Sequence, residues 1–304
     1  MRILIAGAGA TGGYFGARLI QAERDVTFLV RPRRAEQLRD GLRLVGPGGE
    51  ETVPVATVTA EALEGTYDLV IVAVKAGALP DMIDQIAPAM GPETMVLPFL
   101  NGMAHLQALT DRFGPARVLG GIVKVVATVA DDGTIHQMHP IATLTLGPPF
   151  GQVTDRIRRI HRELSVSGME ASIAEDVVGA MWHKWAFITA AGVITCLMRA
   201  PIGDIVAAPD GEPFIRAVIA ETEQVSAAAG HPMPGPEHDA MVGMLSAPGS
   251  GFTSSLYRDV TAGLPHEGEH LLGAFVATAA GLGVDIPLTA LALLQLRAHD
   301  HATA

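Results

Sequence analysis

Two ionisable side chains in the C-terminal half of the sequence suggest proton chemistry, a lysine and a glutamate. Lys184 is the only basic side chain between His183 and Arg199, in an apolar segment that indicates one long helix. An ammonium on such a helix is costly unless it snorkels to water or serves a site, and snorkelling is the ordinary explanation. Glu267 stands near the expected start of another helix, where the helix dipole favours an acid in any case.

Two more polar side chains follow apolar runs that are typical of buried parallel strands. Lys75 comes directly after residues 69–74, and Asn101 comes directly after residues 95–100. Ligands of open α/β sheets bind at the carboxyl ends of the strands, and an amide there can hydrogen-bond a nicotinamide or a substrate. The alternative for both residues is a polar strand end, with Asn101 as a plain helix N-cap.

The N-terminus carries a glycine pattern that is typical of dinucleotide binding. A short apolar strand runs into Gly7-Ala8-Gly9-Ala10-Thr11-Gly12, and a helix-compatible stretch follows. The first glycine permits the tight turn, the second lets a pyrophosphate approach the backbone, and the third lets the helix pack close to the sheet. The N–H groups and dipole of the helix start then attract the phosphates. An ordinary glycine-rich turn is the alternative, but the strand–turn–helix context favours a cofactor site.

The end of the second expected strand, residues 25–30, predicts which cofactor binds. An NAD site places an acid there for the ribose 2′-OH, whereas this sequence has Arg31-Pro32-Arg33-Arg34. Guanidinium groups suit a 2′-phosphate, and basic residues at a helix start oppose the dipole unless an anion is bound. We therefore predict NADP(H), with Arg31 as its main ligand and Arg33 or Arg34 in support. A solvated basic turn is the alternative.

Composition restricts the function further. The chain has 304 residues, a net charge of −11 and no sustained basic run, so nucleic-acid binding is not expected. No signal peptide is predicted, and the longest apolar stretch, residues 185–198, is too short to span a membrane. The single cysteine, Cys196, excludes an internal disulfide and is expected to be an inert buried thiol. We predict no metal site and a cytoplasmic protein.

The elements that must position these residues form two expected domains. Residues 1–172 alternate strands and helices, which predicts an α/β fold with a Rossmann-type doubly wound parallel sheet. Strands between residues 123 and 146, around the turn 131–133, are expected as an antiparallel extension. Residues 173–304 are expected to form an all-helical domain, and the catalytic cleft is expected between the two domains. The helices predicted there are residues 176–198, 212–229, 238–245, 254–262, 265–282 and 287–299.

The order of these motifs resembles the ketopantoate reductase (2-dehydropantoate 2-reductase) family over nearly the whole chain. The resemblance implies a two-domain enzyme that uses NADPH to reduce a 2-oxo acid to a 2-hydroxy acid in pantothenate synthesis. The motifs that carry it are the glycine-rich start, Val74-Lys75-Ala76, Leu100-Asn101-Gly102-Met103, Trp182-His183-Lys184, Ser254-Ser255 and Glu267.

The resemblance also implies a role for each site residue. Lys184 would be catalytic, stabilising the charge on the carbonyl oxygen and supplying its proton. Glu267 would orient the lysine or bind a substrate hydroxyl, and Ser255 would bind the substrate carboxylate. Asn101 would align nicotinamide and substrate, and Lys75 would lie on the cofactor side. The serines at 254 and 255 are otherwise ordinary N-caps.

Three positions depart from the family pattern. Ile188 and Gly192 stand where well-studied members have asparagines on the catalytic helix, and Phe252 stands where a third asparagine precedes the serine. Those amides hold a polar, hydroxylated substrate, so the substitutions predict a more apolar substrate pocket. A second hypothesis follows, a reductase of a different, more apolar 2-oxo acid, 2-oxo amide or ketone on the same scaffold.

Two other hypotheses fit less well. A non-catalytic NADPH-binding sensor needs only the glycine-rich half, and the retained Lys184 and Glu267 argue against it. The β-hydroxyacid dehydrogenases share the two-domain plan, but their Gly-x-x-x-Lys pattern does not match Gly179 and Lys184, which are five residues apart. The expected partner is a small 2-oxo acid, with neither a nucleic acid nor a membrane, and we consider a homodimer as its assembly.

Overall fold

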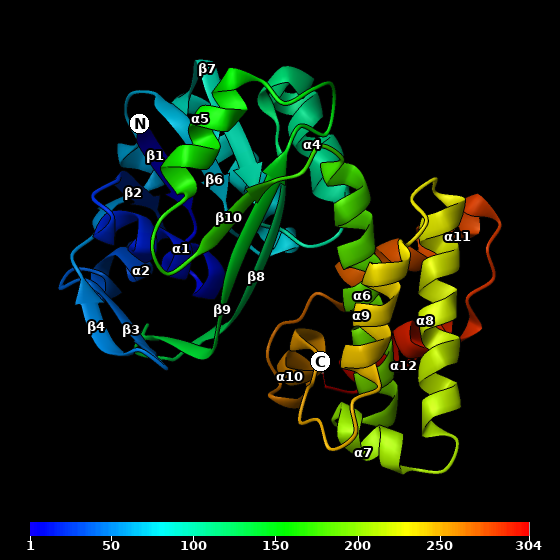
Figure 1. The fold of residues 1–304 in the computed structure, drawn as a ribbon. Helices are drawn as coiled ribbons and strands as arrows, with labels where there is room; N and C mark the ends of the chain where they lie inside the picture. The colour runs from blue at the N-terminus through cyan, green and yellow to red at the C-terminus, as the bar shows by residue number, and fades with distance from the viewer. Residues whose placement is uncertain (304) are drawn as a thin grey trace. The chain divides into compact units, whose positions relative to one another are not determined.

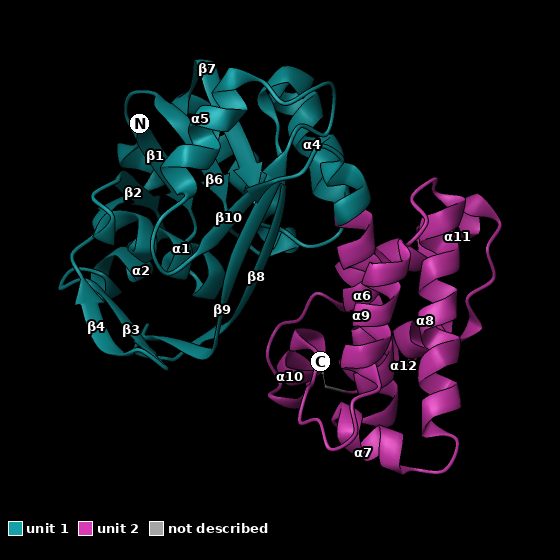
Figure 2. Ribbon diagram, in the orientation of Figure 1, with its two compact units in different colours: residues 1–180 teal, residues 181–304 magenta. Residues whose placement is uncertain are grey.

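The computed structural model describes residues 1–303. The chain divides into two compact units, residues 1–180 and 181–304, which are described separately (Figure 2). The boundary predicted after residue 172 falls within the short strand β10, Glu170–Ile173, a few residues before helix α6, Val177–Met198.

Unit 1 is built on a parallel sheet with the strand order β5-β2-β1-β6-β7 (Figure 1). The chain adds strands first on one side of β1 and then on the other, which makes the sheet doubly wound, as predicted. The strands are β1 Arg2–Ala6, β2 Asp25–Leu29, β5 Ala56–Val58, β6 Tyr67–Val72 and β7 Met90–Pro98. The helices of this unit are α1 Ala10–Gln21, α2 Pro32–Gln37, α3 Leu79–Ile86, α4 Ala104–Phe113 and α5 Asp155–Leu164.

A second sheet of unit 1 has the order β10-β9-β3-β4, and β8 pairs with β9. Its remaining strands are β3 Leu42–Gly46, β4 Gly49–Val53, β8 Gly120–Val129 and β9 Ile135–Gly147. The antiparallel pairing of β8 with β9 confirms the predicted hairpin, but its placement as an extension of the parallel sheet is wrong. The chain keeps one parallel bridge to β7, between Val96 and Val118, and then β9 pairs with β3 and β10 instead.

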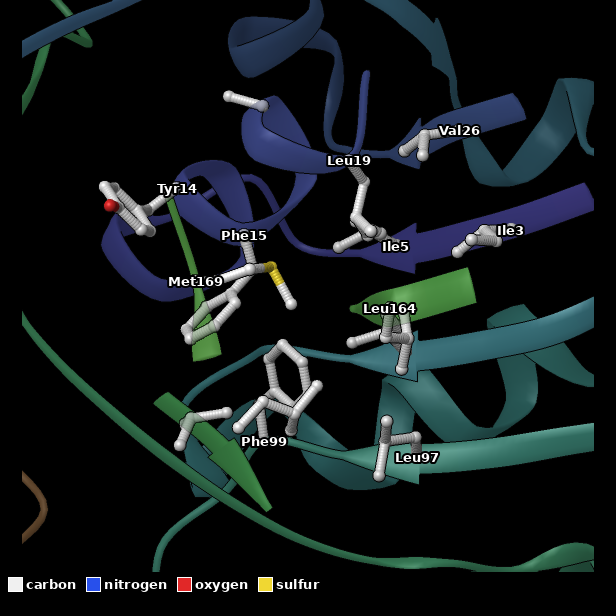
Figure 3. Packing of buried hydrophobic residues seen from close by; sticks show 14 of the residues in the cluster. Ile3, Ile5, Tyr14, Phe15, Leu19, Val26, Leu97, Phe99, Leu164 and Met169 are labelled. Carbon is white, nitrogen blue, oxygen red and sulfur yellow. The ribbon is translucent and has the colours of Figure 1, made fainter. Parts of the chain in front are cut away.

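Helix α1 packs tightly against both sheets because two of its glycines lack side chains. A Cβ on Gly13 would overlap Ile135 of β9, and a Cβ on Gly16 would overlap Phe28 of β2. Buried side chains around α1 form the main core of unit 1, among them Phe15, whose ring meets Phe99 edge-on at 5.3 Å (Figure 3). Burial of each such side chain contributes about 1.5–3 kcal/mol. This packing fixes where α1, and therefore the glycine-rich turn before it, begins.

Unit 2 is helical, as predicted. Besides most of α6 it contains α7 Ile202–Ala207, α8 Gly211–Ala228, α9 Gly235–Leu245, α10 Ser255–Thr261, the π-helical turn η5 Glu269–Gly273, α11 Ala274–Leu282 and α12 Pro287–Thr303. Two details of the prediction were wrong: the short helix α7 was not expected, and the helix expected from residue 265 begins later. His266 accounts for the late start, because its Nδ1 accepts the Gly268 N–H at 3.2 Å and its Nε2 lies 2.8 Å from Asp300 Oδ1.

Helix α6 is longer than the apolar stretch that the sequence suggested. Its 22 residues are enough, by length and composition, to cross a membrane, because the helix extends past Lys184 to Val177, beyond the charge-free stretch considered in the sequence. Its most apolar window is 67% buried inside the protein, however, and Ala186, Ala190, Val193 and Ile194 have no exposed surface. Such burial is what the core helix of a globular protein shows.

Candidate functional site

Two glycines of the N-terminal motif are required by the protein's own packing. Gly7 has a φ of +106°, and a Cβ there would lie 2.6 Å from the carbonyl oxygen of Ala73. Its N–H donates to the Leu29 carbonyl at 3.0 Å, which closes the turn after β1. A Cβ on Gly12 would overlap the Gly7 carbonyl and the Ala73 side chain. Both positions therefore exclude larger residues whether or not a ligand binds.

Gly9 differs, because the protein itself leaves room for a side chain there. A Cβ at this position would meet no heavy atom within 4 Å. Gly9 is also the N-cap of α1, so it offers no side chain to the N–H groups of Ala10, Thr11 and Gly12, while the adjacent Ala8 is buried. An open backbone in front of an uncapped helix start is a cradle for an anionic group such as a pyrophosphate.

The three arginines after β2 have different environments. Arg31, the N-cap of α2, and Arg33 are both exposed. Arg34 is half-buried: its Nε donates to the Ala8 carbonyl at 3.0 Å and its Nη1 to the Gly133 carbonyl at 2.9 Å. Burial lowers the pKa of Arg34. Arg34 thus ties the glycine-rich turn to the β8–β9 turn, a structural role that sequence reasoning missed.

The turn at Gly7, Lys75 and Asn101 lie at one edge of the parallel sheet. The register aligns Ala6 of β1 with Val72 of β6, and Val72 with Pro98 of β7, so all three residues follow neighbouring strands. Lys75 is exposed at the N-cap of a 3-10 turn, and Asn101 is half-buried in the bend before α4. The alternative of Asn101 as an N-cap is wrong, because Met103 occupies that position.

In unit 2, helix α6 carries Lys184, Ile188 and Gly192 at a spacing that gives them one common face. Lys184 and Ile188 are half-buried, and Gly192 is buried. A Cβ on Gly192 would lie 3.3 Å from Leu256 Cδ2 and 3.4 Å from Leu272 Cδ1. The face of α6 that carries Gly192 therefore packs against α10, which begins at Ser255, and against η5, which follows Glu267.

Ser254 and Ser255 have different environments. Ser254 is the buried N-cap of α10: its Oγ accepts the Tyr257 N–H at 3.0 Å and lies 2.8 Å from Thr195 Oγ1 of α6. Ser255 is exposed in the first turn and takes no part in this cap. The interpretation as an ordinary N-cap therefore holds for Ser254. Ser255 is the exposed first residue of α10.

Phe252 and Glu267 flank this helix start along the chain. The Phe252 ring is half-buried with its centroid 6.4 Å from that of Phe187, and the Phe252 carbonyl accepts the Ile202 N–H at 3.0 Å. Glu267 is half-buried, and its carbonyl accepts the Leu271 N–H at 2.8 Å. Unit 2 therefore joins the elements that carry its predicted site residues, Lys184, Ile188, Gly192, Phe252, Ser255 and Glu267.

Other side chains with potential reactivity lie outside these groups. Burial raises the pKa of the Cys196 thiol to about 12, which keeps it protonated and unreactive near neutral pH. Within residues 1–303, no three His, Cys, Asp or Glu side chains gather as a metal site requires.

The chain is similar to known oxidoreductases over nearly its whole length. Residues 3–150 match the family described as "Ketopantoate reductase PanE/ApbA", and residues 176–300 match its C-terminal part. The chain is 34% identical over 300 residues to "Uncharacterized oxidoreductase YkpB" of Bacillus subtilis, covering 97% of this chain and 98% of the relative. It is 30% identical over 253 residues to a 2-dehydropantoate 2-reductase of Mesorhizobium japonicum, covering 76% and 77%. A crystal structure of 2-dehydropantoate 2-reductase from Geobacter metallireducens aligns with a TM-score of 0.88 at 25% identity, over 98% of this chain and 99% of that chain.

Proposed function

The chain belongs to the ketopantoate reductase family of oxidoreductases that act on CH–OH groups with a nicotinamide cofactor, and we propose that it reduces a 2-oxo acid to a 2-hydroxy acid with NADPH. Two separate observations carry the proposal: the glycine-rich cradle in unit 1 and Lys184 in an apolar segment of α6 in unit 2.

The residues of unit 1 fit a dinucleotide. The open position at Gly9 and the uncapped start of α1 would receive the pyrophosphate. Arg31 is exposed at the end of β2, where a ribose 2′-phosphate would be held, and no acid stands there to favour NADH. Arg34 has a buried Nη2 atom with no hydrogen-bond partner within residues 1–303, beside the Ala8 carbonyl. A pyrophosphate oxygen, which NADPH and NADH share, would satisfy that group.

The residues of unit 2 would carry the proton chemistry. Bound NADPH supplies a hydride to the carbonyl carbon of the substrate. As negative charge develops on the carbonyl oxygen, the Lys184 ammonium stabilises it and donates the proton that completes the hydroxyl. Glu267 orients the lysine or binds a substrate hydroxyl, and Ser255 binds the carboxylate. Asn101, which belongs to unit 1, aligns substrate and nicotinamide.

The substitutions at residues 188, 192 and 252 support an apolar 2-oxo acid as the substrate. Gly192 stands where well-studied family members have an asparagine. A Cβ on Gly192 would lie 3.3 Å from Leu256 Cδ2 and 3.4 Å from Leu272 Cδ1, and both leucines are buried. Ile188 replaces a second amide and Phe252 a third. Burying a substrate hydroxyl without a hydrogen-bond partner costs about 1–3 kcal/mol. We therefore propose a substrate with a branched or bulky apolar chain and no distal hydroxyl.

Ketopantoate itself is the second candidate substrate. The 30% identical relative named 2-dehydropantoate 2-reductase favours it. For that substrate we propose a place in pantothenate synthesis. In either case we propose a cytoplasmic enzyme that acts on a small molecule and not on nucleic acid or membranes, with a homodimer as its assembly.

The test is a set of steady-state measurements of NADPH oxidation with ketopantoate, 2-oxoisovalerate, 4-methyl-2-oxovalerate and phenylglyoxylate. We expect the highest kcat/KM for an acid without a hydroxyl. Ile188→Asn should raise the ratio of kcat/KM for ketopantoate over 2-oxoisovalerate by about tenfold. Ile188→Val is the matched control, and it should leave that ratio unchanged. Preference of the unaltered protein for ketopantoate would instead establish the second candidate.

A further inference from the structure

The turn that follows Glu267 has an unusual backbone. Residues Glu269–Gly273 form a π-helical turn, in which the Ala274 N–H bonds to the Glu269 carbonyl five residues back. Such turns are rare and frequently lie at functional sites, because they shift the register of a helix and re-aim the residues beside it. This one begins two residues after Glu267, and it sets the direction in which the chain leaves that residue.

Trp185 contacts this turn and the start of the helix that follows it. Its indole Nε1 donates to the Leu271 carbonyl at 3.2 Å, and its ring meets the Phe275 ring edge-on, with centroids 4.9 Å apart at 87°. Leu271 lies inside the π turn and Phe275 in the first turn of α11. Trp185 is only 3% exposed. The indole N–H therefore has a fixed, desolvated partner, and the Leu271 carbonyl gains a donor from another helix.

A short path of bonds joins Trp185 to both proposed catalytic residues. Trp185 is the residue after Lys184 on α6, while the Leu271 N–H donates to the Glu267 carbonyl at 2.8 Å. Two ties near Glu267 run to α12: Glu269 accepts from Arg297 at 2.5 and 2.9 Å, and His266 lies 2.8 Å from Asp300. The indole hydrogen bond thus connects the segment of Glu267 to the helix of Lys184.

We propose that Trp185 is a positioning residue, whose indole N–H holds the π turn in the register that presents Glu267 to Lys184. The inference rests on the proposed function, in which these two residues act together. It concerns the hydrogen bond specifically, and not only the packing of a large ring.

The experiment separates the hydrogen bond from the ring. The chain has two tryptophans, so Trp182→Phe leaves Trp185 as the only one. In that background, biosynthetic replacement of tryptophan by benzothienylalanine exchanges the indole N–H for sulfur and keeps the size of the ring. We expect kcat to fall about three- to tenfold relative to Trp182→Phe with ordinary tryptophan, the effect of one lost buried hydrogen bond. KM for NADPH should stay within twofold. Trp185→Phe should lower kcat by at least as much.

Two outcomes would overturn the inference, and they are distinguishable. If Glu267→Gln lowers kcat strongly but the benzothienyl protein keeps the kcat of its control, only the ring matters and the positioning role is wrong. If Lys184→Ala and Glu267→Gln both keep the wild-type kcat, the proposed function fails and the inference fails with it. Far-UV circular dichroism of each protein establishes that it is folded before its kinetics are compared.

Discussion

Arg31 and Arg34 are three residues apart, yet their environments predict different consequences of mutation. Arg31 is exposed at the end of β2, where the 2′-phosphate of NADPH would bind. Loss of one charge-assisted hydrogen bond costs about 1.5–3 kcal/mol, and solvent screening at an exposed site favours the lower value. Arg31→Ala should therefore weaken NADPH binding about tenfold and leave NADH binding within twofold.

Arg34→Ala should instead lower the stability of the folded protein. It removes two hydrogen bonds from a guanidinium to carbonyl oxygens, at 3.0 Å to Ala8 and 2.9 Å to Gly133. With the lower value for each, because the side chain is only half-buried, the free energy of unfolding should fall by about 3 kcal/mol. Because the glycine-rich turn loses its hydrogen bond to Arg34, the affinities for NADPH and for NADH should fall equally.

The assay is calorimetric titration of both cofactors against both variants, at low and high salt, together with urea unfolding. Equal losses of NADPH and NADH binding in Arg31→Ala would show that Arg31 does not bind the 2′-phosphate. A selective loss of NADPH binding in Arg34→Ala, with unchanged unfolding, would transfer that role to Arg34 and refute the structural interpretation.

Three further predictions follow from the site. Lys184→Ala should lower kcat by about 10²–10⁴ with little change in NADPH affinity; stopped-flow kinetics checks this, and near-wild-type turnover would leave Lys184 as a snorkelling lysine. Cys196, with a thiol pKa of about 12, should not react with a disulfide reagent at pH 8 until urea unfolds the protein; rapid reaction of the native protein would contradict its burial. Gly9→Ala should weaken NADPH binding at unchanged thermal stability, because only a ligand needs that space, whereas Gly12→Ala should lower stability as well.

The parallel sheet and the helical region could be predicted because their signals are local. Strands buried on both faces appear as continuous apolar runs, and the glycine-rich turn carries its strand and helix with it. The second sheet could not be placed in the same way. Leu44 of β3 pairs with Ile135 of β9, ninety-one residues later, and nothing in either segment specifies the other.

In the candidate site too, features set by neighbouring residues could be predicted, and features set by residues far along the chain could not. The N-cap role of Ser254 follows from its own helix start, whereas the Leu271 carbonyl in the π turn accepts a hydrogen bond from Trp185, 86 residues earlier. Likewise, the tie from Arg34 to Gly133 spans 99 residues, so a basic turn at the end of β2 could not reveal it. The catalytic and substrate-binding assignments themselves stay predictions.

The central claim is tested most directly by following the transferred hydrogen. The protein is incubated with NADPH carrying deuterium at both C4 positions of the nicotinamide and with each 2-oxo acid in turn, and the product is examined by mass spectrometry. We expect a 2-hydroxy acid with one deuterium at C2, formed by the wild-type protein and, in the same time, hardly at all by Lys184→Ala. No deuterated product from any 2-oxo acid, or equal formation by the Lys184→Ala variant, would contradict it.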